Sequence, residues 1–258
     1  KRMIRTIIEK KFILLIFMIL TFFVFPSIVA GEESFYEPLP EIKQPADNLG
    51  NSEKVDLGKM LYFDPKLSGS NWISCATCHN PALGWSDGLP RTMGDGQREL
   101  GRHSPTIINS GYFGVLMWDG RANNLEQQAL GPIQAKVEMN QDMRELIKEL
   151  KAIPGYVKKF KKVYGKSGIS PKNIAKSIAA FERTVISKNS SYDKYWAGDK
   201  KAMSTSAIKG MNLFFGKAKC SICHNGPAFT DSKFHNIGVK QNGPLKEDLG
   251  RYNISKDK

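Results

Sequence analysis

Two short segments of the sequence repeat a cysteine and histidine pattern that is typical of one covalent cofactor chemistry. The first is Cys75-Ala76-Thr77-Cys78-His79, and the second is Cys220-Ser221-Ile222-Cys223-His224. In such a Cys-x-x-Cys-His segment, the two thiols add across the vinyl groups of a haem and the adjacent histidine binds the iron. The segments use all four cysteines of the chain and two of its four histidines. They therefore predict two covalently bound c-type haems, with His79 and His224 as iron ligands.

A zinc site and a redox-active cysteine pair are the alternatives for these four cysteines. A four-cysteine zinc site does not need a histidine directly after both pairs, and a thioredoxin-like pair lies beside a strand–helix pattern that this sequence lacks. Each motif is also followed at once by an asparagine, Asn80 or Asn225. We therefore favour haem attachment at both positions.

Helices separated by long loops are expected to position the two motifs. Apolar residues recur at helical spacing, and no stretch alternates as a strand would. Capping residues and breakers set the ends of the expected helices. These helices cover residues 52–62, 125–131, 140–154 (capped by Asn140), 155–165, 170–185 (capped by Ser170) and 204–215 (capped by Ser204).

The predicted fold class is mainly α, with two c-type cytochrome-like haem domains and long loops. We assign residues 1–30 to a signal peptide, 31–51 to an extended arm, 52–165 to an N-terminal haem domain and 166–258 to a C-terminal haem domain. Only 34 residues follow His224. A haem domain usually needs more chain than this, so we expect the sequence to stop inside the second domain.

The N-terminal residues indicate export. Basic residues precede an apolar stretch from Phe12 to Phe25, and small residues lead to a cleavage position after Ala30, which is the form of a secretory signal. An uncleaved membrane anchor is the alternative. Both place the globular part outside the cytoplasm, as a periplasmic protein. The net charge of +13 comes from scattered lysines, which favours a solvated surface over nucleic-acid binding.

With both motifs placed, the sequence from about Leu57 onward resembles the bacterial dihaem cytochrome c peroxidase and MauG family. The resemblance implies that the haem held by His79 binds peroxide, whereas the haem held by His224 receives electrons from an external donor. Besides the haem motifs, it rests on residues 101–106, 118–122, 126–129, 131–133, 137–139, 179–184 and 234–238.

The resemblance also implies roles for three side chains. Glu138 matches the pocket carboxyl that moves a proton between the two oxygens of peroxide, and Gln128 matches the residue that orients peroxide or water, with Pro132 against the haem edge. Trp118 matches the tryptophan that lies between the two haems. The alternatives are a surface carboxylate for Glu138 and a core aromatic for Trp118. Trp72, Trp85 and Trp196 are interpreted as packing residues.

Two positions depart from the family's pattern. Many family peroxidases have a histidine sixteen residues after the first axial histidine, where it is a removable sixth ligand, and here that position is Asp95. We therefore expect the iron at His79 to stay five-coordinate and open to peroxide. His103 is a substitute metal ligand, and a loop histidine bonded to the backbone is its alternative. His103 stands where family members often have an asparagine that helps to hold a calcium ion. Calcium prefers oxygen ligands, so an imidazole at this position argues against a calcium site.

The predicted function is that of a dihaem cytochrome c peroxidase, which reduces hydrogen peroxide with electrons from a small cytochrome c or cupredoxin. A MauG-like oxidase acting on a protein substrate is one alternative, and a non-catalytic dihaem electron carrier is another. The distal ligand of the second haem would lie beyond Lys258, which leaves the first two open. Other expected properties are a homodimer and membrane contact only through an uncleaved N-terminal segment.

Overall fold

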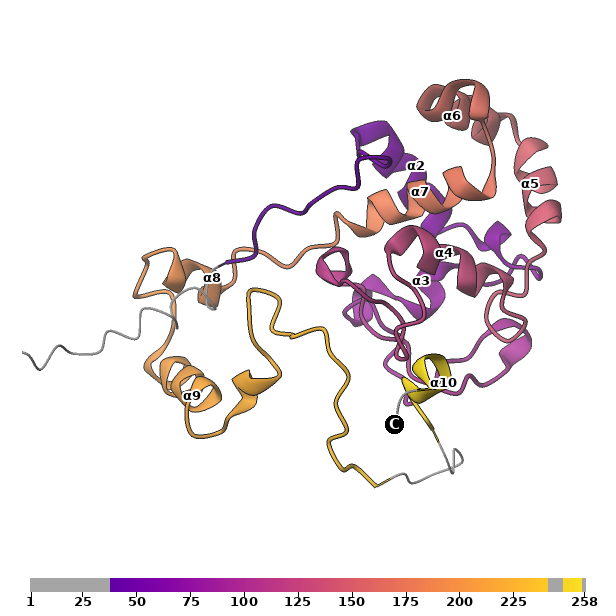
Figure 1. The fold of residues 1–258 in the computed structure, drawn as a ribbon. Helices are drawn as coiled ribbons and strands as arrows, with labels where there is room; N and C mark the ends of the chain where they lie inside the picture. Colours follow the sequence, from indigo (N-terminus) through magenta and orange to yellow (C-terminus); the bar gives the residue numbers. More distant parts are fainter. Residues whose placement is uncertain (1–37, 241–247, 257–258) are drawn as a thin grey trace, which may run out of the picture.

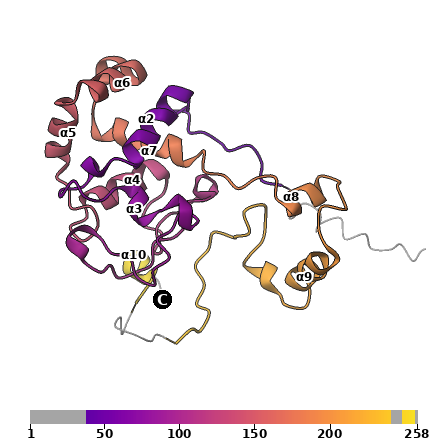
Figure 2. The ribbon, with the colours of Figure 1, turned by 180° about the vertical axis from the view of Figure 1, so that it is seen from behind.

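The computed structural model describes residues 38–240 and 248–256, so the predicted signal peptide lies outside the described residues. Figure 1 shows a larger lobe, which contains helices α2 to α7, and a smaller lobe around α8, α9 and the second motif. Seen from both sides, α10 lies against the larger lobe (Figures 1 and 2). The helices are α2 (Ser52–Tyr62), α3 (Cys75–Cys78), α4 (Leu125–Gln134), α5 (Met143–Lys151), α6 (Pro154–Tyr164), α7 (Pro171–Glu182), α8 (Ser191–Trp196), α9 (Thr205–Phe215) and α10 (Tyr252–Ser255).

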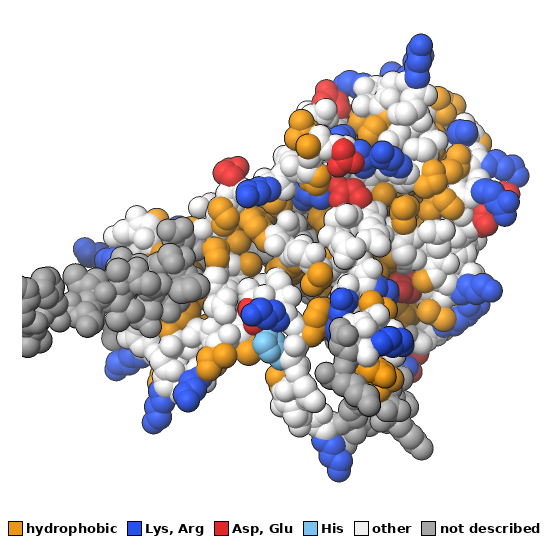
Figure 3. Space-filling view, in the orientation of Figure 1, with side chains coloured by type: hydrophobic (Ala, Val, Ile, Leu, Met, Phe, Trp, Pro, Cys, Tyr) orange, Lys and Arg blue, Asp and Glu red, His pale blue; other side chains and the backbone are white. Residues whose placement is uncertain are grey.

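The predicted mainly helical class is confirmed. Over the described ranges, β structure is limited to three isolated bridges. None of the helices in this part of the chain is long and apolar enough to cross a membrane. On the face drawn in Figure 3, lysine and arginine side chains are spread over the surface and do not form one continuous patch.

The packing of α2 against α7 forms the centre of the larger lobe. Gly58 allows the two helices to approach closely, because a Cβ atom there would lie 1.9 Å from the carbonyl oxygen of Ser177. The predicted apolar stripe of α7 is confirmed, since Ile174, Ile178 and Phe181 are all buried. Each such side chain contributes about 1.5–3 kcal/mol when it leaves water.

Polar caps explain where several helices begin. The Ser170 hydroxyl accepts from the backbone N–H of Asn173 at 3.2 Å, and the Ser204 hydroxyl accepts from Ala207 at 3.1 Å, so both predicted caps are confirmed. The predicted cap at Asn140 is wrong. Asp142 caps α5 instead by accepting from the N–H groups of Arg144 and Glu145.

Two further boundaries differ from the predictions. Helix α4 continues through Pro132 to Gln134, although the sequence predicted an end at Gly131-Pro132. Pro132 has no N–H donor and disfavours further helix, and α4 ends two residues after it. Helix α7 packs on α2 and α4 as part of the larger lobe, although residues from 166 onward were assigned to the second domain.

The predicted extended arm is anchored to the larger lobe by a buried asparagine. Asn48 donates from its side-chain nitrogen to Glu126 Oε1 at 2.6 Å and to the carbonyl oxygen of Lys176 at 3.0 Å. Glu126 also accepts two hydrogen bonds from Arg183, at 2.7 and 2.9 Å. This network joins the arm, α4 and the end of α7, and so fixes the helix that carries Gln128.

Candidate functional site

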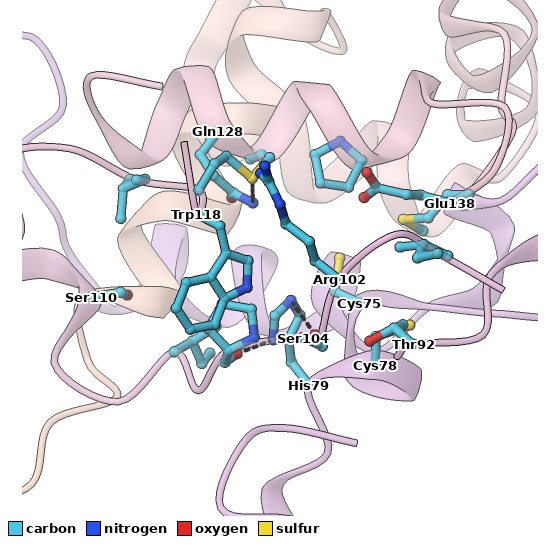
Figure 4. A pocket seen from close by; sticks show the side chains of 18 of the residues that line it. Cys75, Cys78, His79, Thr92, Arg102, Ser104, Ser110, Trp118, Gln128 and Glu138 are labelled. Atoms are coloured by element: carbon cyan, nitrogen blue, oxygen red, sulfur yellow. Dashed lines mark hydrogen bonds between the residues drawn. The ribbon is translucent and has the colours of Figure 1, made fainter. Parts of the chain in front are cut away.

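A cavity of about 560 Å³ lies within the larger lobe, between the first Cys-x-x-Cys-His motif and α4. Cys75, Cys78 and His79 line one side of it, and Gln128 and Glu138 also line its wall. In Figure 4, Gln128 and Glu138 lie on the α4 side of the cavity and His79 lies on the opposite side. The structure thus brings together residues that are far apart in the sequence.

Helix α3 presents the first motif to the cavity. Its start is stabilised because Thr77 Oγ1 accepts a hydrogen bond from the N–H of Ser74 at 2.9 Å. At its end, His79 Nδ1 lies 2.9 Å from the carbonyl oxygen of Pro105, which fixes the ring if Nδ1 carries the proton. Nε2 is then the nitrogen available to a metal. Burial lowers the pKa of His79, which favours the neutral imidazole that metals bind.

One face of α4 forms the opposite wall. Leu125, Gln128, Ala129 and Pro132 line the cavity, and their spacing of three and four residues places them on one side of a helix. Asn124 caps this helix through a 2.8 Å hydrogen bond to the N–H of Gln127. The side-chain nitrogen of Gln128 lies 3.9 Å from the sulfur of Met117, which also lines the cavity.

Glu138 lies in the turn after α4, and a neighbouring loop fixes the position of this turn. The N–H of Asp95 donates to the carbonyl oxygen of Glu138 at 2.7 Å. Gly94 permits this approach, because a Cβ atom there would lie 1.9 Å from the carbonyl oxygen of Val137. Burial raises the pKa of the Glu138 carboxyl, while the charge of Arg121 opposes the shift. A carboxyl with a raised pKa is suited to transfer protons near neutral pH.

Asp95 does not lie in the wall of the cavity. Its carboxylate accepts from the side chain of Asn140 at 3.1 Å, and its backbone holds the turn of Glu138. The position where many family peroxidases have a removable iron ligand therefore has a structural role in this chain.

Trp118 and His103 occur together on the rim of the cavity. The indole N–H of Trp118 donates to the carbonyl oxygen of His103 at 2.7 Å, and the Trp118 side chain is 53% exposed. His103 Nδ1 lies 2.7 Å from the carbonyl oxygen of Leu89. One ring nitrogen of His103 is thus bonded to the backbone. This is the arrangement expected of a loop histidine, which was the alternative to a metal ligand.

The residues present fit a c-type haem in this cavity. Cys75 and Cys78 form no disulfide, and both line the wall beside His79. The hydroxyls of Thr92 and Ser110 also line the wall, and within the described structure both are buried without a hydrogen-bond partner. Buried polar groups are normally satisfied, so unpaired hydroxyls here indicate a missing polar partner.

Sequence reasoning missed three further residues of the wall. Arg102 lines the cavity and is ion-paired with Asp119 at 3.2 Å and with Asp248 at 2.6 Å. Tyr62 and Glu182 are buried, and neither the Tyr62 hydroxyl nor Glu182 Oε2 has a hydrogen-bond partner among the residues described. Burial raises the pKa of Glu182 to about 8. Arg102 and Glu182 lie in segments that carry the family resemblance, which is the only signal that the sequence offered.

The second motif lies in the smaller lobe. His224 Nδ1 lies 3.2 Å from the carbonyl oxygen of Phe229, which repeats the arrangement of His79 with Pro105. Between residues 186 and 240 no side chain is fully buried, and Ile222, inside the motif, is 67% exposed. Cys220 and Cys223 are partly buried and His224 is exposed, whereas the first motif lines a cavity.

Comparison with known proteins decides the family. The family model for di-haem cytochrome c peroxidases (CCP_MauG) matches residues 52–201, which is more than half of the chain. The chain belongs to the di-haem cytochrome c peroxidase family. Its matched region includes the first haem motif, Trp118, Gln128 and Glu138, so every residue predicted for the peroxide site lies within it.

Individual members of the di-haem peroxidase family agree with this assignment. The chain is 44% identical over 226 residues to the methylamine utilization protein MauG of Methylorubrum extorquens, covering 87% of the chain and 63% of the relative. It is 39% identical over 210 residues to the cytochrome c551 peroxidase of Nitrosomonas europaea, covering 81% and 62%. The chain thus spans somewhat less than two thirds of these relatives.

A solved structure shows the same fold. The crystal structure of a MauG-like protein associated with microbial copper homeostasis superposes with a TM-score of 0.75 at 29% identity, covering 85% of the chain and 70% of that structure. The helical architecture described above is therefore that of a MauG-like protein.

Proposed function

We propose that this chain is an exported dihaem cytochrome c peroxidase that reduces hydrogen peroxide to water with electrons from a small periplasmic redox protein. One observation carries the proposal: a single cavity places the thiols and imidazole of the first haem motif opposite Gln128 and Glu138. Reduction of peroxide needs a redox cofactor with a proton-transferring group near the bound peroxide. The cavity holds the residues that would bind a haem together with a carboxyl of raised pKa.

Each residue of the cavity has a distinct role in this proposal. Cys75 and Cys78 would hold the haem covalently, His79 would bind its iron, and the bound haem would supply the redox chemistry. Gln128 orients hydrogen peroxide by donating a hydrogen bond. Glu138 accepts the proton of the inner peroxide oxygen and returns it to the outer oxygen, which leaves as water.

Electrons would enter at the second haem, which Cys220, Cys223 and His224 would hold. The name of the Nitrosomonas relative supports a small c-type cytochrome as the electron donor. Trp118, whose indole lies on the cavity rim, is the aromatic side chain that would connect the two sites.

The test uses the haem-loaded chain with reduced c-type cytochrome and hydrogen peroxide. We expect oxidation of the cytochrome in proportion to the peroxide consumed, and a resting paramagnetic resonance spectrum with a high-spin component from the open iron. An entirely low-spin spectrum that neither reduction nor peroxide alters would refute the proposal and favour a non-catalytic electron carrier.

A MauG-like oxidation of a protein substrate is the second candidate. The observation that favours it is the absence of a removable ligand at Asp95, whose side chain is bonded outside the cavity wall. Reaction of the fully oxidised protein with peroxide, without prior reduction, would support this candidate. A requirement for reduction before any reaction would support the peroxidase cycle instead.

A further inference from the structure

The aromatic cluster behind the cavity wall contains two oxidisable side chains in contact with each other. The ring centres of Tyr62 and Trp85 lie 5.9 Å apart, in an edge-to-face arrangement. Phe63 and Phe181 complete the cluster, with centres 6.3 and 6.0 Å from that of Trp85. A phenol and an indole can each give up an electron, whereas a phenylalanine ring resists oxidation, so Tyr62 and Trp85 are the redox-active pair of this cluster.

This pair connects the cavity to the protein surface. Tyr62 is 1% exposed and lines the cavity, whereas Trp85 lies outside the cavity wall and is only half-buried. The Tyr62 hydroxyl has no hydrogen-bond partner in residues 38–240 and 248–256, so packing alone does not account for a tyrosine at this position. A buried hydroxyl without a partner destabilises the folded protein, and phenylalanine would fill the same space.

The backbone of Trp85 is held in an unfavourable conformation. Its φ angle is +61°, in the left-handed region that bulky residues rarely adopt. A 2.8 Å hydrogen bond from its N–H to the carbonyl oxygen of Asn80 holds this turn. Such strain is often found at functional positions. Here it directs the indole against Tyr62, next to the segment that carries His79.

We propose that Tyr62 and Trp85 form a second electron route out of the first-haem cavity, distinct from Trp118, and that Trp85 is an oxidation site when no electron donor is present. The proposal rests on the proposed function, because hydrogen peroxide reacting at the first haem is the oxidant. It makes Trp85 a site of oxygen incorporation.

The chemistry balances without a further reagent. Each oxygen atom that Trp85 gains comes from water, and the indole gives up two electrons and two protons. Hydrogen peroxide in the cavity takes up two electrons and two protons and becomes two water molecules. Tyr62 relays the electrons singly: its phenol loses an electron and its proton into the cavity, where reduction of hydrogen peroxide consumes both, and both are restored as Trp85 is oxidised.

Glu182 influences the Tyr62 phenol through its charge. It lines the same wall, its Oε2 has no hydrogen-bond partner within the described ranges, and its charge contributes to the raised pKa of Tyr62, although burial is the main cause. The charged groups that influence Glu182 are Arg183, which lowers its pKa, and Glu126 on α4, which raises it. Burial raises the pKa of Glu182 to about 8, which keeps this carboxyl protonated over much of the neutral range.

The experiment treats the haem-loaded chain with hydrogen peroxide in the absence of donor and maps added oxygen by peptide mass spectrometry. We expect Trp85 to be oxidised several-fold more than Trp72, although Trp72 is more exposed, at 64%. Tyr62→Phe should reduce oxidation of Trp85 several-fold relative to the change in haem absorbance that peroxide causes in the same variant. The matched control is Tyr156→Phe, since Tyr156 is also buried but donates to Asp64 at 2.5 Å and lies outside the cavity wall.

The outcomes separate this route from the proposed function. Equal oxidation of Trp72 and Trp85, or unchanged oxidation of Trp85 in Tyr62→Phe, would overturn the route while the haem still reacts with peroxide. A haem whose absorbance does not respond to peroxide would overturn the proposed function, and the route with it.

Discussion

Replacing Gly58 by alanine should separate the two helices on which the cavity depends. The new Cβ atom would lie 1.9 Å from the carbonyl oxygen of Ser177, whereas real Cβ contacts are essentially never under 3.0 Å. Helices α2 and α7 would therefore have to move apart by about 1 Å. Overpacking of this kind costs about 1–3 kcal/mol, and a contact with rigid backbone belongs at the upper end of that range.

A second effect of the same substitution acts in the opposite direction. Alanine is favoured over glycine inside a helix by about 1 kcal/mol. The net loss is thus about 2 kcal/mol, which lowers the melting temperature by roughly 4–8 °C in a domain of this size. Because Tyr62 ends α2 and Glu182 ends α7, the shift also reaches the cavity wall and should alter the absorbance of the bound haem.

Thermal and denaturant unfolding of the haem-loaded protein measure the effect. The matched control is Gly155→Ala in α6, where a Cβ atom meets nothing within 4 Å. This control should be neutral or stabilising by about 0.4–1 kcal/mol. If Gly58→Ala were as stable as Gly155→Ala, the close approach of α2 and α7 would not be essential to the fold.

Three further predictions concern carboxylates. Glu138→Gln should preserve peroxide binding but slow its cleavage by about 10²-fold or more, as measured by rapid mixing, whereas Glu145→Gln on the exposed face of α5 should leave the rate unchanged. For Glu182, the stabilising contribution is fully present below its ordinary pKa of 4.5 and is lost as the pH rises through about 8, with a slope of up to about 1.4 kcal/mol per pH unit. Glu182→Gln should flatten this slope in denaturant titrations, and an unchanged slope would count against a buried, protonated carboxyl. Glu126→Ala should destabilise the protein by about 3–5 kcal/mol, because it leaves the buried Arg183 guanidinium without its partner. Glu145→Ala, which breaks only the exposed pair with Lys148, should change the stability by less than about 1 kcal/mol.

The local sequence determined the haem motifs and several helix ends. Cys-x-x-Cys-His is a contiguous pattern, and a cap such as Ser170 acts on N–H groups within three residues, so both can be predicted without the fold. The prediction failed at Asn140 and Pro132. There, hydrogen bonds to Asp95 and the neighbouring turn decide the conformation.

Only the tertiary structure decided which side chains share the cavity wall. Glu138 is interpreted as a surface carboxylate on local pattern alone, and its burial comes from the loop that Gly94 allows to pack against it. Tyr62, Trp85 and Glu182 lie on three separate segments, and nothing in their spacing indicates contact. The sequence alone indicates haem attachment because the Cys-x-x-Cys-His motif needs only adjacent residues, whereas proton and electron transfer depend on distances that long-range packing sets.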